Sequence, residues 1–523
     1  MLGQHFSNAD RSVFVLTDLP EMVKGALFAR YSRSPKTLRR LFLDEFQYGI
    51  ESEGKTATVG LGRAADLYER VFIEYGDDSV AQLAGVHVAV EGASNLLTKI
   101  IERGRLMSYL EQSTRYMPYN DQPNGHWRYH IPEELSGRGR DRFVEAVNRA
   151  FELYTKLFEP LQTYLKTQYP QPEGTSGGAY RMSIRAKACD ILRGLLPAAT
   201  TSNLGIYGSA QAYEALLLRL LSHELAEARQ AGEAMLAELK KVVPVFVERV
   251  DRRDRGGVFI DYLRSGRQAT RNQVQSLAAI SGEDTLDAPQ VDLTDFDADG
   301  ETRVVAAVLF ELAGLSDREA VQTAKALAPR ERAEIIAAYA GPRSNRRHRP
   351  GRAFERTAYR FEIVADYGAF RDLQRHRLLT MEWQALSPHL GFDLPPEIAG
   401  INADGEWRDL MEFCREVYEE LLQEISATVA QYVVPMAYRL RFVMDMNARE
   451  AMHVIELRTT EQAHRNYRIL CLEMYRLIAE RAGHRAIAET MTFVGDGVAG
   501  LERLNAEQRI EEKRSALAAR PGQ

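Results

Sequence analysis

Cysteine is scarce in this chain of 523 residues, which contains only Cys189, Cys414 and Cys471. These three are far apart, and no Cys-x-x-Cys pair or His-Glu-x-x-His motif occurs. The composition therefore excludes a secreted fold held by disulfides, and we expect no metal site. Isolated cysteines are typical of a reducing compartment, so we expect a cytoplasmic protein.

Long apolar runs and a large excess of one charge are also missing. No stretch of 18 apolar residues occurs and the N-terminus lacks the pattern of a secretory leader, so we expect neither a membrane span nor export. The net charge of −6 gives no bulk attraction to nucleic acid, and any anion binding must therefore be local.

Local positive charge is concentrated in residues 103–116, RGRLMSYLEQSTRY, where Arg103, Arg105 and Arg115 lie close to Ser113. A guanidinium group is permanently charged and forks to two oxygens, which suits a planar or phosphorylated anion. No histidine lies near Ser113 and no Gly-x-Ser-x-Gly elbow surrounds it, so we interpret its hydroxyl as an anion donor and not as a nucleophile.

The arginine pattern recurs in broken form at residues 375–377, RHR. In each copy the same landmarks follow in the same order: a proline after two apolar residues (RGLLP at 193–197, QYVVP at 431–435), then Leu-Arg (218–219 and 457–458). Apolar spacing predicts helices over residues 220–242 and 459–482, and strands over 86–90 and 358–364. The first copy is longer in the middle, where residues 121–175 are expected to be loop-rich. The chain therefore indicates a tandem duplication.

These observations predict an α/β (α+β) fold with sheet and long helices in each of two copies. We assign residues 1–250 to the first copy and residues 301–498 to the second. Residues 251–300 are rich in Asp, Gly, Ser and Arg and lack sustained periodicity, so they are expected to be a linker. The charged tail, residues 499–523, is expected to be a surface helix with a frayed end.

Other motifs favour structural roles. Residues 49–56 (GIESEGKT) fit a phosphate-binding loop, but a helical stretch precedes them and Glu51 and Glu53 would repel a phosphate. Residues 60–65 (GLGRAA) follow no strand and suggest a turn. The five arginines between residues 343 and 352 lack interleaved aromatics, which favours a solvated loop over a nucleic-acid patch. His453 and His464 are expected to be structural.

The ordered landmarks resemble those of the flavin-dependent thymidylate synthases over roughly residues 20–245 and 300–495. That family carries Arg-His-Arg, a serine, Asn-Glu, Ser-x-Arg-Tyr, an arginine before a proline, Asn-Ala-Arg and Leu-Arg. The first copy matches at Arg103, Arg105, Ser108, Glu111, Ser113, Arg115, Tyr116, Arg193, Pro197 and Arg219. It departs at Gly104, where the family has histidine, and at Leu110, where it has asparagine.

The second copy retains a different part of the family pattern. It keeps residues 375–377, Asn-Ala-Arg at 447–449 and Leu-Arg at 457–458, but it lacks the Ser-x-Arg-Tyr segment. Gln431 stands where Arg193 stands in the first copy. The first copy thus keeps residues of the nucleotide side, and the second keeps residues of the flavin side.

The resemblance implies reductive methylation of dUMP to dTMP, with methylenetetrahydrofolate as carbon donor and NADPH reducing FAD. It assigns Arg219 and Arg103 to catalysis beside the nucleotide. The implied substrate-binding residues are Glu111, Ser113, Arg115, Arg193 and Arg458, and the implied flavin-binding residues are Arg375, His376, Arg377, Asn447 and Arg105. The family assembles as a homotetramer with composite sites, so a tandem chain is expected to form a homodimer that imitates it.

Three other functions stay open at this point. Gly104, Leu110 and Gln431 each remove an expected group, which favours a nucleotide- or flavin-binding protein without catalysis. A flavoenzyme that acts on another pyrimidine nucleotide or a folate is the third reading, and a nucleic-acid binder is a distant fourth.

Overall fold

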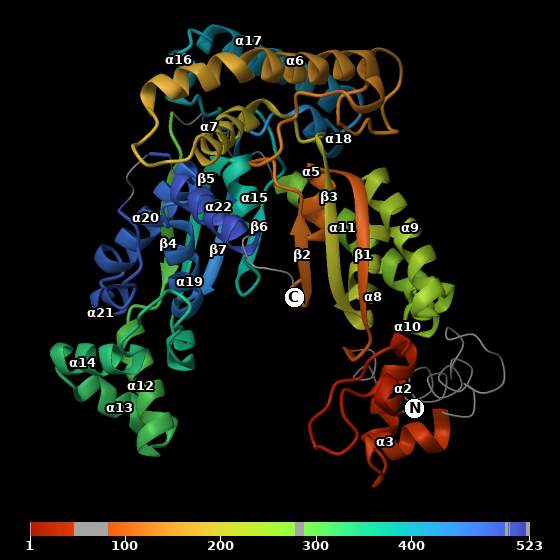
Figure 1. Cartoon of the computed structure of the whole chain (residues 1–523), viewed down its shortest axis with the longest axis vertical. Coiled ribbons are helices and arrows are strands. Elements are labelled where there is room, and N and C mark those ends of the chain that lie inside the picture. Colours follow the sequence, from red (N-terminus) through yellow and green to blue (C-terminus); the bar gives the residue numbers. More distant parts are fainter. Residues whose placement is uncertain (1, 47–81, 278–286, 497–499, 502, 519–523) are drawn as a thin grey trace. The chain divides into compact units, whose positions relative to one another are not determined.

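The structure is a computed structural model that describes residues 2–46, 82–277, 287–496, 500–501 and 503–518 (Figure 1). The chain divides into two compact units, which do not coincide with the two sequence copies. Unit 1 contains residues 1–93, 97–112 and 202–281, and unit 2 contains residues 94–96, 113–201 and 282–523. The motif at 49–56 that fits a phosphate-binding loop and the turn expected at 60–65 lie outside the described residues.

Unit 1 is built on a three-stranded sheet in the order β1 (Gly85–Ser94), β3 (Thr201–Ser209), β2 (Met107–Glu111). Strands β2 and β3 are antiparallel, with Met107 opposite Gly208. Strand β3 alternates buried and outward-facing residues, as expected for a sheet with one covered face. The helices of this unit are α1 (Leu2–His5), α2 (Glu21–Tyr31), α3 (Leu38–Leu41), α5 (Asn95–Ile101), α8 (Ala210–Leu221), α9 (Ala226–Val242), α10 (Pro244–Asp251) and α11 (Val258–Leu277).

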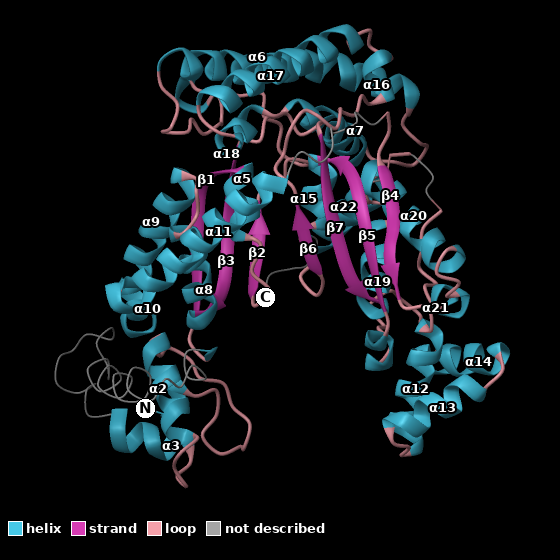
Figure 2. Cartoon of the chain, turned by 180° about the vertical axis from the view of Figure 1, so that it is seen from behind, coloured by secondary structure: helices cyan, strands magenta, loops and turns pink. Residues whose placement is uncertain are grey.

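Unit 2 is built on a four-stranded antiparallel sheet in the order β4 (Gln290–Phe296), β5 (Ala358–Asp366), β7 (Arg439–Asn447), β6 (Thr380–Trp383) (Figure 2). The central pair runs from Ala358 opposite Asn447 to Asp366 opposite Arg439. Both sheets thus confirm the strands expected near residues 86–90 and 358–364.

The helices of unit 2 supply most of its core. They are α6 (Gly137–Gln168), α7 (Gly177–Leu192), α12 (Gly300–Ala313), α13 (Asp317–Ala326), α14 (Pro329–Ala340), α15 (Tyr367–Leu373), α16 (Pro396–Ala399), α17 (Asp404–Glu424), α18 (Ala427–Ala430), α19 (Ala448–Arg458), α20 (Arg465–Glu480), α21 (Arg485–Glu489) and α22 (Leu504–Ala518). Helix α6 packs against α17, and Arg142 pairs with Glu420 between them (Figure 1).

Three sequence expectations were wrong in detail. Residues 121–175 are not loop-rich, because they contain the 32-residue helix α6, which buries Phe143, Phe151 and Leu161 on one face. The single helix expected over 220–242 is broken between α8 and α9, where Ser222 ends α8. The helix expected from residue 459 begins only at Arg465, after the His464 cap.

The interval expected to be a linker, residues 251–300, also carries regular structure. It holds the 20-residue helix α11 and the strand β4, which pairs with β5. Most side chains of α11 are exposed, and β4 buries only Leu293, so neither element needs many apolar residues. The edge strand β4 leaves little periodic signal in the sequence. Helix α11 does leave one, because Phe259, Tyr262 and Leu263 recur at three- and four-residue spacing.

A short antiparallel contact joins equivalent segments of the two copies inside unit 2. Pro197 and Pro435, the matching landmark prolines, lie opposite each other. The amide of Ala198 donates to the carbonyl of Val434 at 2.9 Å, and that of Ala437 donates to Gly194 at 2.9 Å. Self-complementary pairing of equivalent segments is the geometry of a twofold interface. The duplication is therefore visible in space as well as in sequence.

Candidate functional site

Arg115, from the loop after β2, is held by two side chains of unit 2. Its Nε and Nη2 donate to the two carboxylate oxygens of Asp190 on α7, each at 2.6 Å, and its Nη1 donates to the Tyr467 hydroxyl at 3.0 Å. Arg115 and Asp190 are 12% and 13% exposed. Such a forked pair fixes both the position and the plane of the guanidinium.

Arg193 follows directly after α7 and is the more available of the two first-copy arginines. Its Nη1 donates to Asp372 at 3.1 Å, and both side chains are buried. Its Nη2 is buried and has no hydrogen-bond partner within the protein. Because an unsatisfied buried donor is costly, this atom marks a place where a ligand oxygen would be stabilised.

The second copy brings its own basic residues to Asp372 as well. Arg375 approaches Asp372 at 3.5 Å, and the Nη2 of Arg458 donates to the carbonyl oxygen of Asp372. The Nε of Arg458 also donates to Nε2 of His376 at 2.9 Å. Asp372, at the end of α15, therefore gathers Arg193 from one copy and Arg375 and Arg458 from the other.

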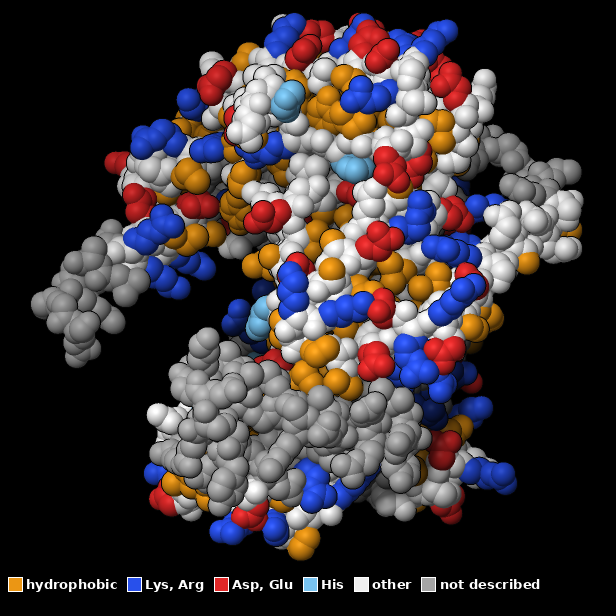
Figure 3. All heavy atoms as spheres, turned by 90° about the vertical axis from the view of Figure 1, so that its right-hand side faces the viewer, with side chains coloured by type: hydrophobic (Ala, Val, Ile, Leu, Met, Phe, Trp, Pro, Cys, Tyr) orange, Lys and Arg blue, Asp and Glu red, His pale blue; other side chains and the backbone are white. Residues whose placement is uncertain are grey.

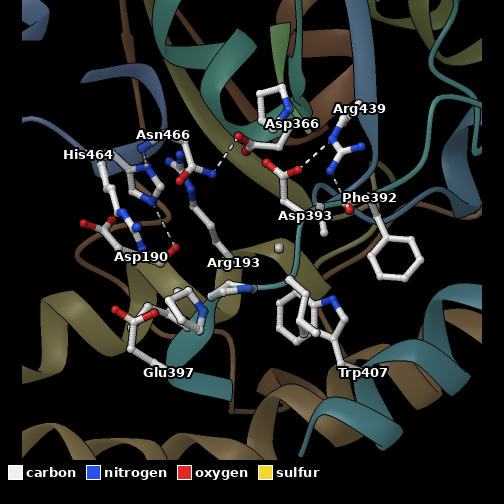
Figure 4. Close-up of a pocket in the computed structure, with 18 of the residues that line it drawn as sticks. Asp190, Arg193, Asp366, Phe392, Asp393, Glu397, Trp407, Arg439, His464 and Asn466 are labelled. Carbon is white, nitrogen blue, oxygen red and sulfur yellow. Dashed lines mark hydrogen bonds and ion pairs between the residues drawn. The ribbon is translucent and has the colours of Figure 1, made fainter. Parts of the chain in front are cut away.

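A cavity of about 640 Å³ opens beside Arg193 and is lined entirely by residues of unit 2 (Figure 4). Asp366, the N-cap of α15, faces Arg193 across it and accepts a hydrogen bond from Asn466 at 2.8 Å. On another wall Asp393 pairs with Arg439 at 2.7 Å. The side chains of Phe392 and Trp407 add flat apolar surface, so the cavity offers both charged groups and planar contacts.

The electrostatics of the cluster keep the arginines charged and the neighbouring histidine neutral. Burial opposes ionisation of Asp190, but the Arg115 guanidinium outweighs it and lowers the pKa of Asp190 to about 2. Burial likewise opposes ionisation of Asp372, yet Arg193 and Arg375 hold its pKa well below the ordinary value. Burial, reinforced by Arg193, lowers the pKa of His464 to about 3.

Asp366 behaves differently from the other two aspartates. Burial raises its pKa, although Arg193 and the hydrogen bond from Asn466 act in the opposite direction. Asp366 therefore gains less from the arginines than Asp372 does. A ligand anion beside Arg193 would raise the pKa of Asp366 further and favour its protonated, hydrogen-bond-donating form.

Comparison with known proteins identifies the family. The model described as Thymidylate synthase complementing protein matches residues 26–245 and 294–482, one region in each copy. The chain belongs to this family.

Two relatives match this chain over nearly its whole length. A UPF0159 protein of Chlamydia pneumoniae is 37% identical over 521 residues, covering 98% of this chain and 97% of that protein. A UPF0159 protein of Thermoplasma acidophilum is 32% identical over 523 residues, covering 94% and 99%. A flavin-dependent thymidylate synthase of Clostridium tetani is 28% identical over 182 residues, covering 33% and 66%.

Among solved structures, the chain is similar to a UMP/dUMP methylase, PolB, from Streptomyces cacaoi bound with 5-Br dUMP. The sequence identity is 20% and the TM-score is 0.32, with 41% of this chain and 99% of that chain covered. Among the described residues of this family member, no helix is both long enough and apolar enough to cross a membrane.

The sequence-predicted residues of this thymidylate synthase complementing family member divide between the two units. Ser113, Arg115, Arg193, Arg375, His376, Arg377, Asn447 and Arg458 lie in unit 2, and Arg103, Arg105, Glu111 and Arg219 lie in unit 1. In unit 2 the structure brings five of them to the cluster around Asp190 and Asp372, namely Arg115, Arg193, Arg375, His376 and Arg458.

Three of the residues that were predicted to belong to the site make contacts within the protein itself. The Asn447 side chain caps α19 by accepting from the amide of Glu450 at 2.9 Å. The Ser113 hydroxyl accepts from the amide of Arg115 at 3.3 Å. Glu111 is buried in unit 1 and pairs with Lys99 at 3.1 Å. Their assignment to substrate or flavin stays a prediction.

Gly104, which replaces the family histidine, has a specific packing reason. A Cβ atom at this position would lie 2.6 Å from the hydroxyl of Tyr109 and 3.5 Å from Nη2 of Arg219. Tyr109 therefore fills the space that a larger side chain at position 104 would need. A histidine at position 104 would therefore require Tyr109 to move.

Sequence reasoning missed the acidic members of the site, Asp190, Asp366 and Asp372. Asp372 lies three residues before Arg375, and Asp366 directly precedes a helix, but single aspartates at such positions are common N-caps or surface residues. Only the tertiary pairing with Arg115 and Arg193 distinguishes them. His464, weighed as structural, caps α20 and does lie in the cavity wall.

Most arginines of the basic run between residues 343 and 352 contact other side chains of the protein. Arg343 forks to Glu456, Arg349 contacts the ring of His453, and Arg352 pairs with Glu355. The contacts of these three arginines favour a structural role for the run over a nucleic-acid patch. On a different face, drawn in Figure 3, Lys and Arg side chains are interspersed with Asp and Glu.

His376, Glu450 and His453 offer ligand atoms that lie within 4.8 Å of one another. Arg458 donates to His376, and Arg349 lies at 3.2 Å from a ring nitrogen of His453. The guanidinium groups of Arg458 and Arg349 thus contact the two histidines. Because a cation there would face this positive charge, we assign no metal to the cluster.

Glu450 predicts a pH effect on stability. Burial raises its pKa to about 7, although Arg349 and Arg449 act in the opposite direction. A carboxyl group with a raised pKa stabilises the fold below its unfolded pKa, and this stability is lost as the pH rises toward 7. The loss from Glu450 amounts to about 3 kcal/mol.

Glu450→Gln removes this titration and keeps the size of the side chain. We expect its Tm relative to that of the parent protein to be higher at pH 8 than at pH 5, measured by thermal denaturation. Glu416→Gln, an exposed change on α17, serves as control. A Tm difference that stays constant between the two pH values would contradict the raised pKa of Glu450.

Proposed function

We propose that this chain binds dUMP in the cavity beside Arg193 and methylates it reductively to dTMP, as an atypical flavin-dependent thymidylate synthase. The observation that carries the proposal is the buried Nη2 of Arg193, which lacks a protein partner and borders a cavity with flat apolar walls. Membership of the thymidylate synthase complementing family and the relatives named as flavin-dependent thymidylate synthases support it.

In this proposal Arg193 binds the phosphate, because its free Nη2 can donate to a phosphate oxygen without breaking the contact to Asp372. Arg115 is a weaker candidate, since its Nε and Nη2 are already used by Asp190. It acts in positioning, by holding α7 and thus Arg193 in place.

Arg458 does not line the cavity itself, but it contacts Asp372, which also holds Arg193, and we propose that it lies beside the uracil ring. His376 and the carbonyl of Asp372 fix two of its nitrogens, so its positive charge is oriented before the substrate arrives. A preoriented guanidinium stabilises negative charge that develops on the ring during reaction. Arg219 and Arg103, in unit 1, stay predictions for the catalytic role.

The residues present fit FAD in part. Arg375 is 38% exposed and Arg377 is half-buried, so both can meet a diphosphate. His376 and Asn447 are engaged by Arg458 and by the α19 backbone. When bound, the flavin would supply the hydride, with methylenetetrahydrofolate as carbon donor and NADPH as reductant. The protein's own task is to orient the nucleotide and to exclude water.

Arg193→Gln tests the phosphate contact. We expect this change to weaken dUMP binding by about 2–4 kcal/mol, as loss of a charged clamp does, and to affect uridine binding much less, because uridine has no phosphate. The binding is measured by the change in the visible flavin spectrum of the FAD-loaded protein, and by calorimetry without FAD.

Arg356→Gln, an exposed change whose partner is Asp317, is the matched control and should leave dUMP affinity unchanged. Asp372 keeps Arg375 and Arg458 nearby in Arg193→Gln, so the variant is expected to fold. Equal dUMP affinity in Arg193→Gln and the parent protein would exclude Arg193 from the site.

Binding without catalysis is the second candidate function. The replacement of the family histidine by Gly104, with Tyr109 packed into its space, favours it for the first copy. Production of dTMP from dUMP separates the two functions: a dUMP-dependent flavin change without any dTMP would favour a binding protein.

The proposed homodimer is tested by size-exclusion chromatography with light scattering, where a monomer would contradict it.

A further inference from the structure

Helix α11 directs its uncharged side toward solvent. When successive residues are placed about 100° apart around the helix axis, its charged residues all fall on one side, namely Asp261, Arg264, Arg267 and Arg271. The opposite side, called here the apolar side, has no charged residue and carries Val258, Phe259, Tyr262, Gly266, Val274 and Leu277. A helix of a water-soluble unit normally buries its apolar side, whereas α11 exposes it.

The charged side attaches α11 to the rest of unit 1. Arg264 donates to the carbonyl oxygen of Leu221 at 2.6 Å, and Arg267 donates to that of Ser222 at 3.0 Å, both at the C-terminus of α8. Arg271 pairs with Glu224 at 2.6 Å. The C-terminus of a helix carries partial negative charge, which stabilises guanidinium groups placed there. These contacts direct the apolar side away from α8.

The apolar side is exposed over its whole length. Val258 is 61% exposed, Tyr262 66%, Val274 55% and Leu277 59%. Together with Phe259 these side chains present about 500 Å² of surface, so two such helices packed together would remove about 1,000 Å² from water, which is the smallest area typical of a specific interface. The apolar side alone is therefore large enough to hold a second helix of the same kind.

Gly266 lies at the centre of the apolar side, between large residues toward both ends. Glycine inside a helix is unfavourable relative to alanine. A Cβ atom at this position would meet nothing within 4 Å, so packing within the chain does not require a glycine here. Ala269, also exposed, follows almost one turn later. Small residues at this point allow a neighbouring helix to come close.

This order of large, small and large side chains is complementary to itself. When two α11 helices pack antiparallel about their centres, Gly266 lies near Ala269 of the partner subunit. The Val258 end of the helix then lies beside Leu277 of the partner subunit. A twofold interface uses the same surface on both subunits, and two uncharged surfaces leave no charge unpaired between them. The apolar side therefore suits a second copy of this chain.

A membrane or a nucleic acid fits the apolar side less well. Helices that lie on membranes use Lys and Arg beside their apolar side to contact lipid headgroups, whereas three arginines of α11 contact the end of α8 and Glu224. A nucleic acid requires positive charge, which the apolar side lacks. Residues 258–277 also lie between the two regions that match the family model, so the family pattern does not explain this surface.

We propose that the apolar side of α11 is a dimerisation surface, on which the α11 helix of a second copy of this chain lies antiparallel, with the closest approach at Gly266. The proposal gives the homodimer proposed above a defined contact, and it does not rest on dUMP binding.

Tyr262→Lys tests the surface by placing a charge within the apolar side. We expect the parent protein to be a dimer and this variant to have a dimer dissociation constant at least about 10-fold higher, because the charge would be buried without a partner. Size-exclusion chromatography with light scattering over a concentration series measures both. The Tyr262 ring is exposed and stacks on Phe259 at 5.9 Å, so the variant is expected to fold.

Gln268→Lys is the matched control. It adds the same charge to an exposed position on the charged side of α11, and the dissociation constant should not change. A parent protein that stays monomeric would overturn the proposal, and so would equal dissociation constants for Tyr262→Lys and Gln268→Lys. Binding of a monomeric parent protein to phosphatidylcholine vesicles would overturn it in favour of a lipid surface.

Chemical cross-linking tests the antiparallel arrangement. The three native cysteines are buried, so an added exposed cysteine reacts selectively. We expect a short bismaleimide to link two chains of Ala269→Cys, near the centre of the helix pair, but not two chains of Gln268→Cys. Denaturing gel electrophoresis detects the linked product. A dimeric protein in which neither variant is linked, or both are linked equally, would contradict the pairing of α11 with itself.

The outcome is separable from that of the proposed function. Tyr262→Lys should still bind dUMP in calorimetry without FAD, because the cavity beside Arg193 is lined by residues of unit 2 and α11 belongs to unit 1. Arg193→Gln should still form a dimer. Failure of one proposal is therefore distinguishable from failure of the other.

Discussion

Arg115→Ala is expected to lower the free energy of unfolding of unit 2 by about 3–5 kcal/mol. The reason is that the carboxylate of Asp190 stays buried after its partner is removed. Burial opposes ionisation of Asp190, and Arg115 is the main group that outweighs burial and lowers the pKa of Asp190 to about 2, so without Arg115 it would be a buried charge that has lost its main partner. Hydrogen exchange of the α7 amides, together with thermal denaturation, measures the effect.

The double variant Arg115→Met/Asp190→Leu is the matched control. It removes both charges and replaces them with apolar groups, and buried ion pairs replaced in this way often lose little stability. We expect the double variant to recover most of the loss seen in Arg115→Ala. An equal loss in the single and the double variant would show that packing, and not the charge on Asp190, determines the stability of this region.

This prediction also affects how binding data are interpreted. Arg115→Ala would reduce dUMP binding through loss of structure even if Arg115 never touched the nucleotide. Arg193→Gln is the sharper probe, because Asp372 keeps two other arginines near it. Comparing both variants separates direct contact from positioning.

Arg343→Ala is expected to cost unit 2 about 3–5 kcal/mol as well. Arg343 forks to Glu456 at 2.6 and 2.5 Å and also donates to the carbonyl of Thr490 at 2.8 Å. Both charged side chains are almost fully buried, at 3% and 1% exposure. Arg343→Lys should recover only part of the loss, because an ammonium group cannot fork to two oxygens.

Arg347→Ala provides the comparison within the same basic run. Arg347 is exposed, so its removal should change stability by less than about 0.5 kcal/mol. Thermal denaturation of the three variants gives the order. Similar losses in Arg343→Ala and Arg347→Ala would contradict the structural role of the Arg343–Glu456 pair.

The arginine run illustrates what the sequence can reveal and what it cannot. Five arginines among turn residues indicate a polar loop, and the structure confirms this loop. The local sequence does not show that Arg343, unlike its neighbours, is buried in an ion pair. Its partner Glu456 is more than a hundred residues away, on α19. Pairings of this kind depend on the tertiary fold, and the same is true of Asp190 and Asp372.

Periodic elements were more accessible. Strand β7 alternates buried and half-buried positions and β5 does so over its first half, and the landmark prolines lie in equivalent places in both copies. Residues 121–175 were expected to be loop-rich, although Phe143, Val147, Phe151 and Tyr154 of α6 recur at three- and four-residue spacing. Helix α11 was missed although Phe259, Tyr262 and Leu263 recur at helical spacing, because the interval 251–300 as a whole is rich in Asp, Gly, Ser and Arg.

The pairing of Pro197 with Pro435 has a consequence for how such a site can change. In an assembly of identical subunits, any substitution near a twofold axis appears twice, facing its own copy, and both sides must tolerate it. Here the two sides are separate stretches of one chain. Arg193 pairs with Asp372, whereas its counterpart Gln431 accepts a hydrogen bond from the amide of Leu386 at 2.9 Å. Because the two copies are joined in one chain, each copy can change independently of the other. The first copy has the charged Arg193 at this place, and the second has the neutral Gln431.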